Sequence, residues 1–497
     1  MEQLSAQDAS FLYAETPTTP SVGAWLNIYD PSTAHEGTVR FKQILAAYEA
    51  RLERARYLRA RIVRVPMDLD HPYWVDDADF DLEFHVRHLA LPKPGDWRQL
   101  CIQVARIVAR PLDLTRPPWE LYVIEGLDNV DGVPPGSFAI LDKTHHAAMD
   151  GHTGTELHDG MHSLTPDDQR FDPPSSWTPE PMPTEWELLG RAHLNHATMP
   201  MRLAETLGRS FAIPALAPET LSALPLVPSP RTAVPRTRFN DPVTPHRVYD
   251  GRRLELARLR DARQAVPGAT VNDTLLGVVG GALRLYLTEK GELPGEPLVA
   301  MAPVSIRDPE TQSGGNKVSA IFVPIGTQIG DPIDRLAAIH HATNEQKVML
   351  EAVDARSLVE YAEFVPGGLV SASQRVTAEL GLANMRAPFF NTSLTNLPGS
   401  QVPQYFLGAQ LVGWWGVGIA TDNTGLFHSA QSYCGTVHLS AISCPKMLPD
   451  PAFYAECLQE SYDDLVRATS NMRPSRSKSA ERRTTKSSSQ SKRARPA

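Results

Sequence analysis

The sequence is poor in cysteine and has no long apolar run. Only four of its 497 residues are cysteines, and they are scattered: Cys101, Cys434, Cys444 and Cys457. Their number and spacing argue against a disulfide framework or a cysteine-based zinc site, so a reducing cytosol is the expected compartment. The longest apolar stretch, 275–287, is broken by Arg284 and falls short of the ~20 residues that span a bilayer. Residues 1–11 lack the apolar core of a secretory signal.

Glycine is outnumbered by proline, 32 to 43, and no Gly-X-Y period is present. The hydrophobic and charged fractions, 42% and 21%, are typical of globular proteins, and the length predicts two or three domains. Prolines gather in 173–183 and again in 214–245. We therefore predict an N-terminal domain over 1–172, a proline-rich crossover with one helix (186–208) over 173–244, and a second domain over 245–470.

Charge is divided unevenly along the chain. The last 25 residues hold nine Lys and Arg against Glu481 alone, a net charge of +8, which leaves −17 for residues 1–472. An acidic body argues against a nucleic-acid-binding core. The tail over 471–497 is predicted to be disordered. It is either a solubilising end or a basic arm for anionic lipid, with nucleic acid as a weaker option.

Each half of the sequence mixes strand and helix patterns, which predicts a mixed α/β (α+β) fold. Strands are expected over 61–65, 137–145 and 318–326. Helices are expected over 41–56, 271–286 and 332–350.

The segment 137–160, SFAILDKTHHAAMDGHTGTELHDG, has the strongest chemical signal. It begins as a strand, reaches His145-His146, continues to Asp150-Gly151, and has capping-box spacing at Thr153-x-x-Glu156. The histidines are therefore expected on a loop between a strand end and a helix start. A histidine transfers protons near neutral pH because its ordinary pKa is about 6.5.

Metal binding is the rival use of these residues. His158 and His162 have the i, i+4 spacing of a helical zinc pair. Gly160 weakens a helix between them, and no third ligand is evident in the sequence. No metal is expected at this site.

Several segments outside this cassette form a recognisable series. They are LSAQDASFLYAET (4–16), RPLDLTRPPWELYVIEGL (110–127), FNDPVTPHR (239–247), VNDTLL (271–276), APVSIR (302–307), GGNKVS (314–319), LTNLPGS (394–400) and SYCGTV (432–437). With KTHHAAMDG (143–151), this series resembles the bacterial wax ester synthase/diacylglycerol acyltransferase family, whose relatives share HHxxxDG. Ser440 and Cys444 depart from it, standing where the family usually has Gly and Asp.

The resemblance implies two chloramphenicol-acetyltransferase-like domains with the active site at their interface. It further implies an O-acyltransferase that moves a long-chain acyl group from acyl-CoA to diacylglycerol. Acyl-CoA would be a co-substrate, and no resident cofactor is expected. The catalytic motif would comprise His146 as general base with His145, Asp150 and Gly151 shaping its loop. A cytoplasmic enzyme is expected, with the basic tail a candidate for peripheral contact with the inner membrane or lipid inclusions.

Weaker candidates come from the other motifs. Asn272, Ser305 and Asn396 are candidate donors to the oxyanion or substrate, although each has an ordinary structural reading. Arg307 is a candidate partner of Asp150. Cys434 is expected to be a buried thiol. The pairs Trp414-Trp415 and Phe389-Phe390 would line an acyl channel or belong to the core.

Three alternatives stay open at this point. A wax ester synthase acting on long-chain fatty alcohols would need the same base and the same apolar channel. A catalytically silent lipid- or membrane-binding paralogue is a second alternative, against which the intact HHxxxDG motif argues. A condensation-type domain acting on carrier-bound substrates is the third, and the lack of an attached carrier domain lowers it.

Overall fold

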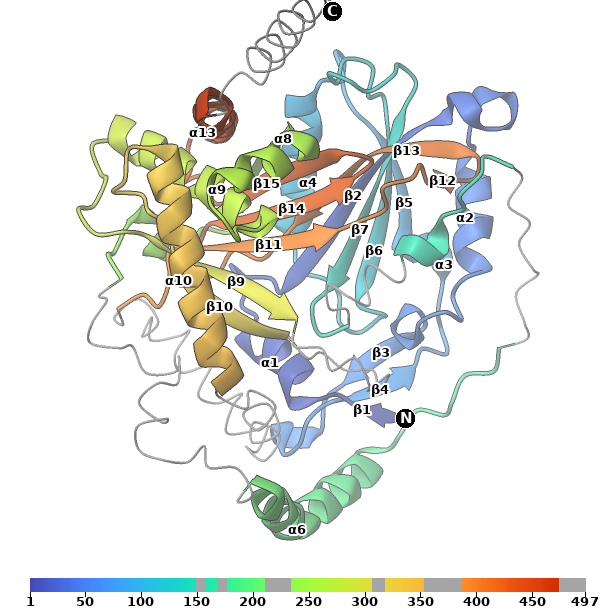
Figure 1. Ribbon diagram of the computed structural model, residues 1–497. Helices are drawn as coiled ribbons and strands as arrows, with labels where there is room; N and C mark the ends of the chain where they lie inside the picture. Colours follow the sequence, from blue (N-terminus) through green and yellow to red (C-terminus); the bar gives the residue numbers. More distant parts are fainter. Residues whose placement is uncertain (149–157, 168–176, 211–233, 306–317, 353–386, 473–497) are drawn as a thin grey trace, which may run out of the picture.

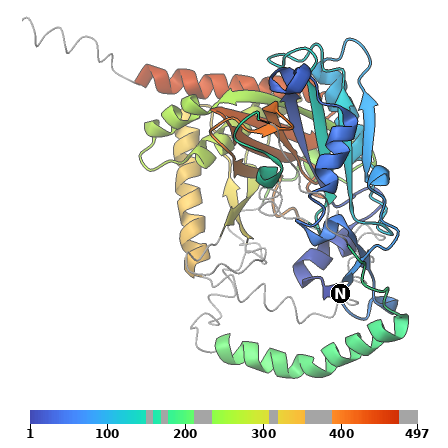
Figure 2. The ribbon, with the colours of Figure 1, turned by 90° about the vertical axis from the view of Figure 1, so that its right-hand side faces the viewer.

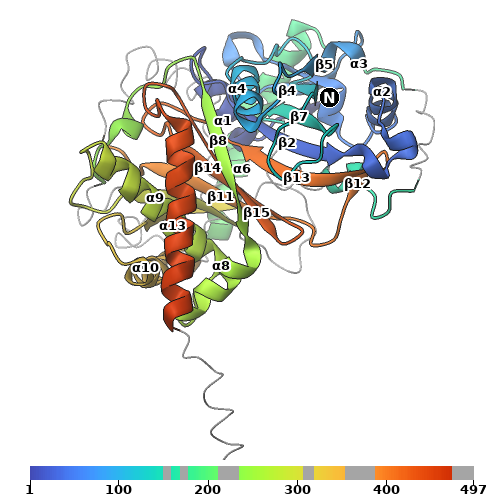
Figure 3. The same ribbon diagram turned by 90° about the horizontal axis from the view of Figure 1, so that it is seen from above.

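Two six-stranded sheets, each covered by helices, form two lobes that lie side by side (Figures 1 and 3). The computed structural model describes residues 1–148, 158–167, 177–210, 234–305, 318–352 and 387–472. The mixed α/β fold expected from the sequence is therefore confirmed.

The sheet of the first lobe has the order β12-β13-β2-β7-β6-β5. Its strands are β2 (Val22–Asp30), β5 (Val86–Ala90), β6 (Trp119–Glu125), β7 (Phe138–His145), β12 (Tyr405–Phe406) and β13 (Ala409–Val417). A smaller three-stranded sheet, β1 (Glu2–Gln3), β4 (Tyr73–Asp76) and β3 (Ala60–Val63), lies near the N-terminus.

Helices cover this first sheet on both faces: α2 (Phe41–Glu49), α3 (Leu82–His85) and α4 (Trp97–Val108). Helix α1 (Ala6–Ala14) packs instead against Ile62 of the small sheet and against Ala147. Helix α4 buries Leu100, Val104 and Val108 in one core cluster with alternate residues of β2, a spacing that puts them on one helix face. The other alternate residues of β2 pack with α2 in a second cluster. Burial on both faces explains why residues 138–141 of β7 are apolar without a break.

The sheet of the second lobe has the order β10-β9-β11-β14-β15-β8. Its strands are β8 (Val248–Glu255), β9 (Val299–Ser305), β10 (Val318–Pro324), β11 (Thr392–Pro398), β14 (Phe427–Tyr433) and β15 (Thr436–Ser443). Its helices are α8 (Leu256–Ala262), α9 (Val271–Glu289), α10 (Pro332–Ala352) and α13 (Pro451–Met472). Helix α9 packs against both α10 and α13.

Strand β13 joins the two lobes. By sequence it belongs to the second half, yet it pairs antiparallel with β2 at the edge of the first sheet. It also contacts β14 of the second sheet, where Gly416 N–H donates to the Gln431 side chain at 2.7 Å. The hydroxyl of Ser440 donates to the Gly416 carbonyl at 2.6 Å, so this departure from the family pattern lies at the lobe junction. Cys444 is buried in the core of the second lobe.

The crossover contains helix α6 (Glu185–Ser210), which lies along one end of the molecule, away from the large sheets (Figure 2). The helix predicted over 186–208 is confirmed, and it runs through Pro200. Leu188 and Ala192 pack it against Val65 and Val75 of the first lobe. Among the described residues, none of the helices combines the length and apolarity that a membrane crossing needs.

One predicted helix was too long. The helix expected over 41–56 ends at Glu49, and the chain reaches the buried Tyr57 and Leu58 through turns. The guanidinium of Arg51 donates to the Ala47 carbonyl at 3.0 Å and so satisfies an acceptor of the last helical turn. A side-chain hydrogen bond that reaches four residues back along the chain therefore caps a helix that the apolar spacing would have continued.

Candidate active site

The two candidate histidines lie at the end of β7, as the sequence predicted. Register pairs Thr144 with Gly23 of β2 on one side and with Trp119 of β6 on the other. The chain then turns, with the Ala148 N–H donating to the His145 carbonyl at 2.9 Å. Asp150, Gly151 and the helix start expected near Thr153 lie outside the described residues.

The ring of His145 is fully buried, and both of its nitrogens have partners. Nδ1 accepts the backbone N–H of Ala147 at 3.0 Å, and Nε2 lies 3.3 Å from Oε2 of Glu15. Because Nδ1 accepts a hydrogen bond, the neutral ring carries its proton on Nε2 and directs it at the Glu15 carboxylate. Neither nitrogen of His145 is left to meet a substrate.

His146 is the partly exposed member of the pair. Its backbone N–H donates to the Ser21 carbonyl at 2.8 Å. Its ring stacks on Phe11 of α1 with centroids 4.9 Å apart and planes inclined by 17°. An ideal Cβ built on Gly23 would lie 3.6 Å from Nε2 of His146, so the glycine leaves room beside that nitrogen. Helix α1 and strand β2 thus orient the ring.

A buried ion pair anchors β7 to β6 just before the histidines. Lys143 and Glu120 face each other across the two strands, with Nζ and Oε2 3.1 Å apart. Arg87 extends the pair with a 2.7 Å contact to the other oxygen of Glu120. Burial lowers the pKa of Lys143. Removing one partner from such a pair leaves an uncompensated buried charge, so the geometry of the strand end depends on it.

Of the weaker candidates, three lie on elements of the second lobe: Asn272, Ser305 and Asn396. Asn272 lies in the first turn of α9 and Asn396 on β11, both half-buried. Ser305 ends β9, and Arg307 lies outside the described residues. Among the hydrogen bonds and ring contacts of the described residues, none joins the side chain of Asn272 or Asn396 to His145. Their role at the site stays a proposal.

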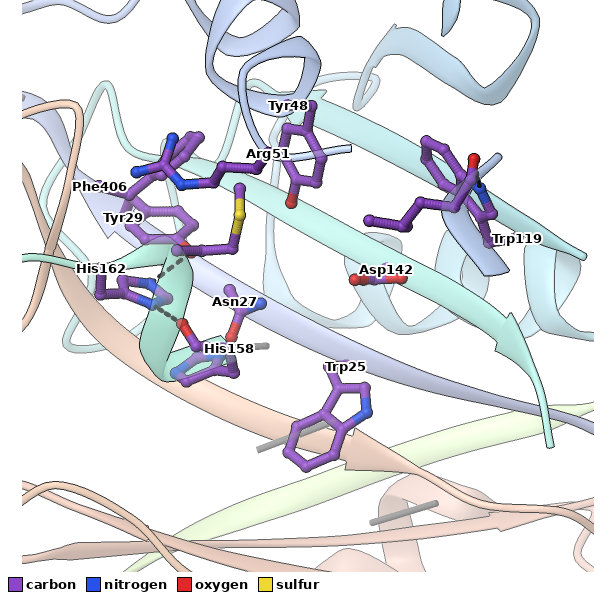
Figure 4. A pocket seen from close by; sticks show the side chains of 12 residues that line it. Trp25, Asn27, Tyr29, Tyr48, Arg51, Trp119, Asp142, His158, His162 and Phe406 are labelled. Carbon is purple, nitrogen blue, oxygen red and sulfur yellow. Dashed lines mark hydrogen bonds between the residues drawn. The ribbon is translucent and has the colours of Figure 1, made fainter. Parts of the chain in front are cut away.

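A cavity lies between the first sheet and the residues around α2 (Figure 4). It is lined by Trp25, Asn27, Tyr29, Tyr48, Arg51, Leu58, Trp119, Asp142, His158, Met161, His162 and Phe406. Neither His145 nor His146 is among these residues. Asp142 lies four residues before His146 on β7, roughly 13 Å along an extended strand.

Burial shifts the pKa values of Asp142, His158 and His162 in this cavity towards their neutral forms. Burial raises the pKa of Asp142 to about 6, and its recorded hydrogen bond comes from the Thr144 hydroxyl at 3.1 Å. Burial lowers the pKa of His162 to about 4 and that of His158 well below its ordinary value. At neutral pH the two histidines are therefore uncharged, whereas a carboxyl with a pKa of about 6 is mostly ionised.

The suspected zinc pair is engaged in ordinary contacts. Nδ1–H of His162 donates to the His158 carbonyl at 2.6 Å, and Nε2 accepts from the Tyr29 hydroxyl at 2.9 Å. The rings of His158 and His162 pack at 4.3 Å between centroids. In the regions that the structure describes, no group of three His, Cys, Asp or Glu side chains is placed to hold a metal.

The exposed fractions of the side chains test two other expectations, one for Cys434 and one for the aromatic pairs. The prediction that Cys434 is buried was wrong: it is exposed, with a φ of 43°, in the tight connection between β14 and β15. The short turn forces its side chain outward. Trp414 and Trp415 are core residues at 1% and 2% exposure. Phe389 is exposed at 41%.

Three residues that contact the histidine pair were not predicted from the sequence: Glu15, Phe11 and Ser21. They lie in or just beyond the segment 4–16, which the sequence analysis used only as a signature. The available signal was a glutamate that directly follows a helix and precedes a strand containing a glycine. No local feature of this segment indicates that the Glu15 carboxylate contacts His145. The two residues are 130 positions apart in the sequence, so only the fold brings them into contact.

The similarity of the chain to known proteins shows its family. Residues 4–275 match the model of the wax ester synthase/diacylglycerol acyltransferase catalytic domain, and residues 314–466 match that of the WS/DGAT C-terminal domain. A diacylglycerol O-acyltransferase homologue of Mycobacterium tuberculosis is 31% identical over 478 residues, covering 94% of this chain and 90% of the relative. Another from the same species is 33% identical over 475 residues, covering 94% and 99%.

Solved structures give the same picture. The wax ester synthase/diacylglycerol acyltransferase from Marinobacter aquaeolei VT8 superposes with a TM-score of 0.66 at 25% identity, covering 94% of this chain and 100% of that one. Trichothecene 15-O-acetyltransferase from Fusarium sporotrichioides shares the fold, with a TM-score of 0.57 at 12% identity and 94% of each chain covered. This chain therefore belongs to the wax ester synthase/diacylglycerol acyltransferase family and is an acyltransferase.

Proposed function

We propose that this chain transfers a long-chain acyl group from acyl-CoA to the hydroxyl of diacylglycerol, forming triacylglycerol, with His146 as the general base. The difference between the two histidines carries the proposal. His145 is buried with both nitrogens hydrogen-bonded inside the protein, whereas His146 is partly exposed and oriented by its backbone and by ring stacking. The relatives named as diacylglycerol O-acyltransferases support this acceptor.

The chemistry needs a base more than a nucleophilic side chain, because a thioester carbonyl is already activated. His146 accepts the hydroxyl proton as the alcohol oxygen attacks that carbonyl, a contribution of about 10²–10⁴-fold. The new C–O bond gives a tetrahedral oxyanion. As it collapses, the C–S bond breaks and the imidazolium returns its proton to the thiolate, which releases CoA-SH and the ester.

The remaining motif residues have supporting roles in this proposal. Asp150 and Gly151 shape the histidine loop, with Arg307 as the partner of Asp150. Asn272, Ser305 and Asn396 are the candidate donors to the oxyanion, where one hydrogen bond is worth about 3–4 kcal/mol. Excluding water protects the thioester from hydrolysis.

The location and domain division are also proposals. We keep an acyltransferase domain over 1–172, a crossover over 173–244, a second domain over 245–470, and a basic tail over 471–497. The tail's net charge of +8 supports a cytoplasmic enzyme that contacts anionic membrane or lipid-inclusion surfaces peripherally.

The test is thiol release from palmitoyl-CoA by the purified protein, with and without added diacylglycerol. We expect release that depends on the acceptor and yields triacylglycerol by mass spectrometry. His146→Ala should lower this rate by at least 10²-fold. The matched control is His196→Ala, which removes an exposed histidine on α6 and should leave the rate unchanged.

The other outcomes each reject a part of the proposal. A fully active His146→Ala variant removes the base assignment. Faster transfer to hexadecanol than to diacylglycerol would instead favour the wax ester synthase. Failure with every alcohol, despite tight acyl-CoA binding, would indicate a silent lipid-binding protein.

A further inference from the structure

Both carboxylate oxygens of Glu15 have partners near the histidine pair, one at His145 and the other at Ser21. Oε2 lies 3.3 Å from Nε2 of His145, and Oε1 accepts the backbone N–H of Ser21 at 3.2 Å. The side chain is 14% exposed, so these contacts are largely shielded from solvent. A single carboxylate therefore links the end of α1 to the start of β2 and to the last residue of β7.

The same short segment also holds His146. The Ser21 carbonyl accepts the N–H of His146 at 2.8 Å, and the Ser21 hydroxyl donates to the Phe11 carbonyl at 2.8 Å. Phe11 in turn stacks on the His146 ring. A closed path of contacts thus runs from Glu15 through Ser21 to the backbone of His146, and from Ser21 through Phe11 to its ring.

The hydrogen bond from Ala147 makes the chemistry of Glu15 specific. That N–H occupies Nδ1 of His145, so Nε2 must present a proton, and the group opposite must accept it. Ser21 presents a second N–H to the same side chain. A carboxylate accepts both, whereas a glutamine accepts one and turns its own N–H₂ towards the other donor.

We infer that Glu15 is a positioning residue for the acyl-transfer step: it locks His145 in its Nε2–H form and thereby holds the adjoining His146 in the orientation needed to take the acceptor's proton. The inference rests on the proposed function, because it assigns the base to His146. Glu15 itself touches no substrate in this scheme. Small displacements of an oriented base cost about 10²-fold in rate, which is the size of effect the inference requires.

The first test is Glu15→Gln, which preserves shape and removes one acceptor. We expect kcat to fall about 10- to 100-fold, with KM for palmitoyl-CoA and for diacylglycerol unchanged within about twofold. The matched control is Glu83→Gln, at an exposed glutamate of the same lobe, which should keep wild-type kcat. Wild-type kcat in Glu15→Gln overturns the inference, as does a change confined to KM.

A double-mutant cycle separates action through His145 from a general structural loss. If Glu15 acts through that ring, Glu15→Gln combined with His145→Ala should be no slower than His145→Ala alone. Multiplicative losses would show that the two side chains act independently and would reject the route through His145.

A measurement on the unaltered protein covers the case in which the variants unfold. Nitrogen-15 NMR of histidine-labelled protein, with the His145 signals assigned by His145→Gln, should show a neutral ring protonated at Nε2 near pH 7. A ring protonated at Nδ1 rejects the inference. An active His146→Ala variant would remove the proposed base while leaving this tautomer result intact, so the two failures are distinguishable.

Discussion

At the scale of single residues, the ionisable side chains of His145 and Asp142 on β7 face different partners. The proton of His145 meets a carboxylate, whereas Asp142 has no recorded cation beside it among the described residues and relies on the Thr144 hydroxyl. Burial therefore raises the pKa of Asp142 from 3.8 to about 6. The alternation of side chains along β7 places this carboxyl on the side of the strand that faces the cavity, although burial destabilises its charged form.

Replacing Asp142 should make the protein more stable at neutral pH. Because the folded-state pKa is raised, stability falls as pH rises from about 4 through about 6 and stays lower above that range. Asp142→Asn removes that loss, which amounts to at most about 3 kcal/mol. Urea denaturation should show the gain at pH 8 and none at pH 4.

The matched control for this prediction is Asp79→Asn, at an exposed aspartate of the same lobe. It should not change the pH dependence of unfolding. Equal stability of Asp142→Asn and wild type at pH 8 would show that the carboxyl is paired or hydrated in the folded protein.

At the scale of elements, α9 is buried on most of its surface and begins at a reciprocal cap between Thr270 and Asp273. Its glycines are not equivalent. An ideal Cβ on Gly280 would lie 2.1 Å from the Ile325 carbonyl oxygen, closer than real atoms approach. On Gly277 it would meet only the Ile339 side chain, at 3.9 Å. The helix approaches the end of β10 so closely because residue 280 has no side chain.

The two glycines therefore predict opposite effects. Gly280→Ala should destabilise by about 1–3 kcal/mol or more, because the backbone oxygen cannot move aside. Gly277→Ala should stabilise by up to about 1 kcal/mol, because alanine is the better helix former and the space is open. Urea midpoints of both variants provide the check, each serving as the control for the other. A stabilising Gly280→Ala would mean that α9 packs elsewhere.

At the scale of the whole molecule, the two lobes share a strand. Strand β13 pairs with β2 through residues 410–417 and 24–30, with a bulge between Leu411 and Gly413. Without it, β2 would present an unpaired edge, and such edges promote aggregation. Helix α4 adds a second link, since Trp97 Nε1 donates to Asp250 of β8 at 2.8 Å.

The first lobe should therefore not fold correctly by itself. A fragment of residues 1–210 is expected to aggregate, whereas co-expression with residues 234–472 should give a soluble complex that co-purifies. Size-exclusion chromatography would distinguish these outcomes. A soluble monomer of 1–210 with native circular dichroism would show that β13 is dispensable.

Local patterns were sufficient to predict much of the secondary structure and the place of the histidines. The apolar residues 138–141 predicted β7, and the run over 271–286 predicted α9, because both elements are buried on most of their surface. The predictions of a helix over 41–56 and of a buried Cys434 failed because the backbone turns at both places: the Arg51 side chain caps the end of the helix, and Cys434 lies in a tight turn.

The sequence by itself determined the mixed α/β fold, the strand that ends at His145-His146, and the family, since these depend on periodicity and on contiguous motifs. Only the tertiary structure decided that β13 completes the first sheet, that Glu15 faces His145, and that Asp142 is buried beside a cavity. Those contacts join residues more than a hundred positions apart or depend on the sheet's packing. They form because packing the apolar faces of both sheets fixes which polar side chains lie next to one another. No local sequence pattern contains that information.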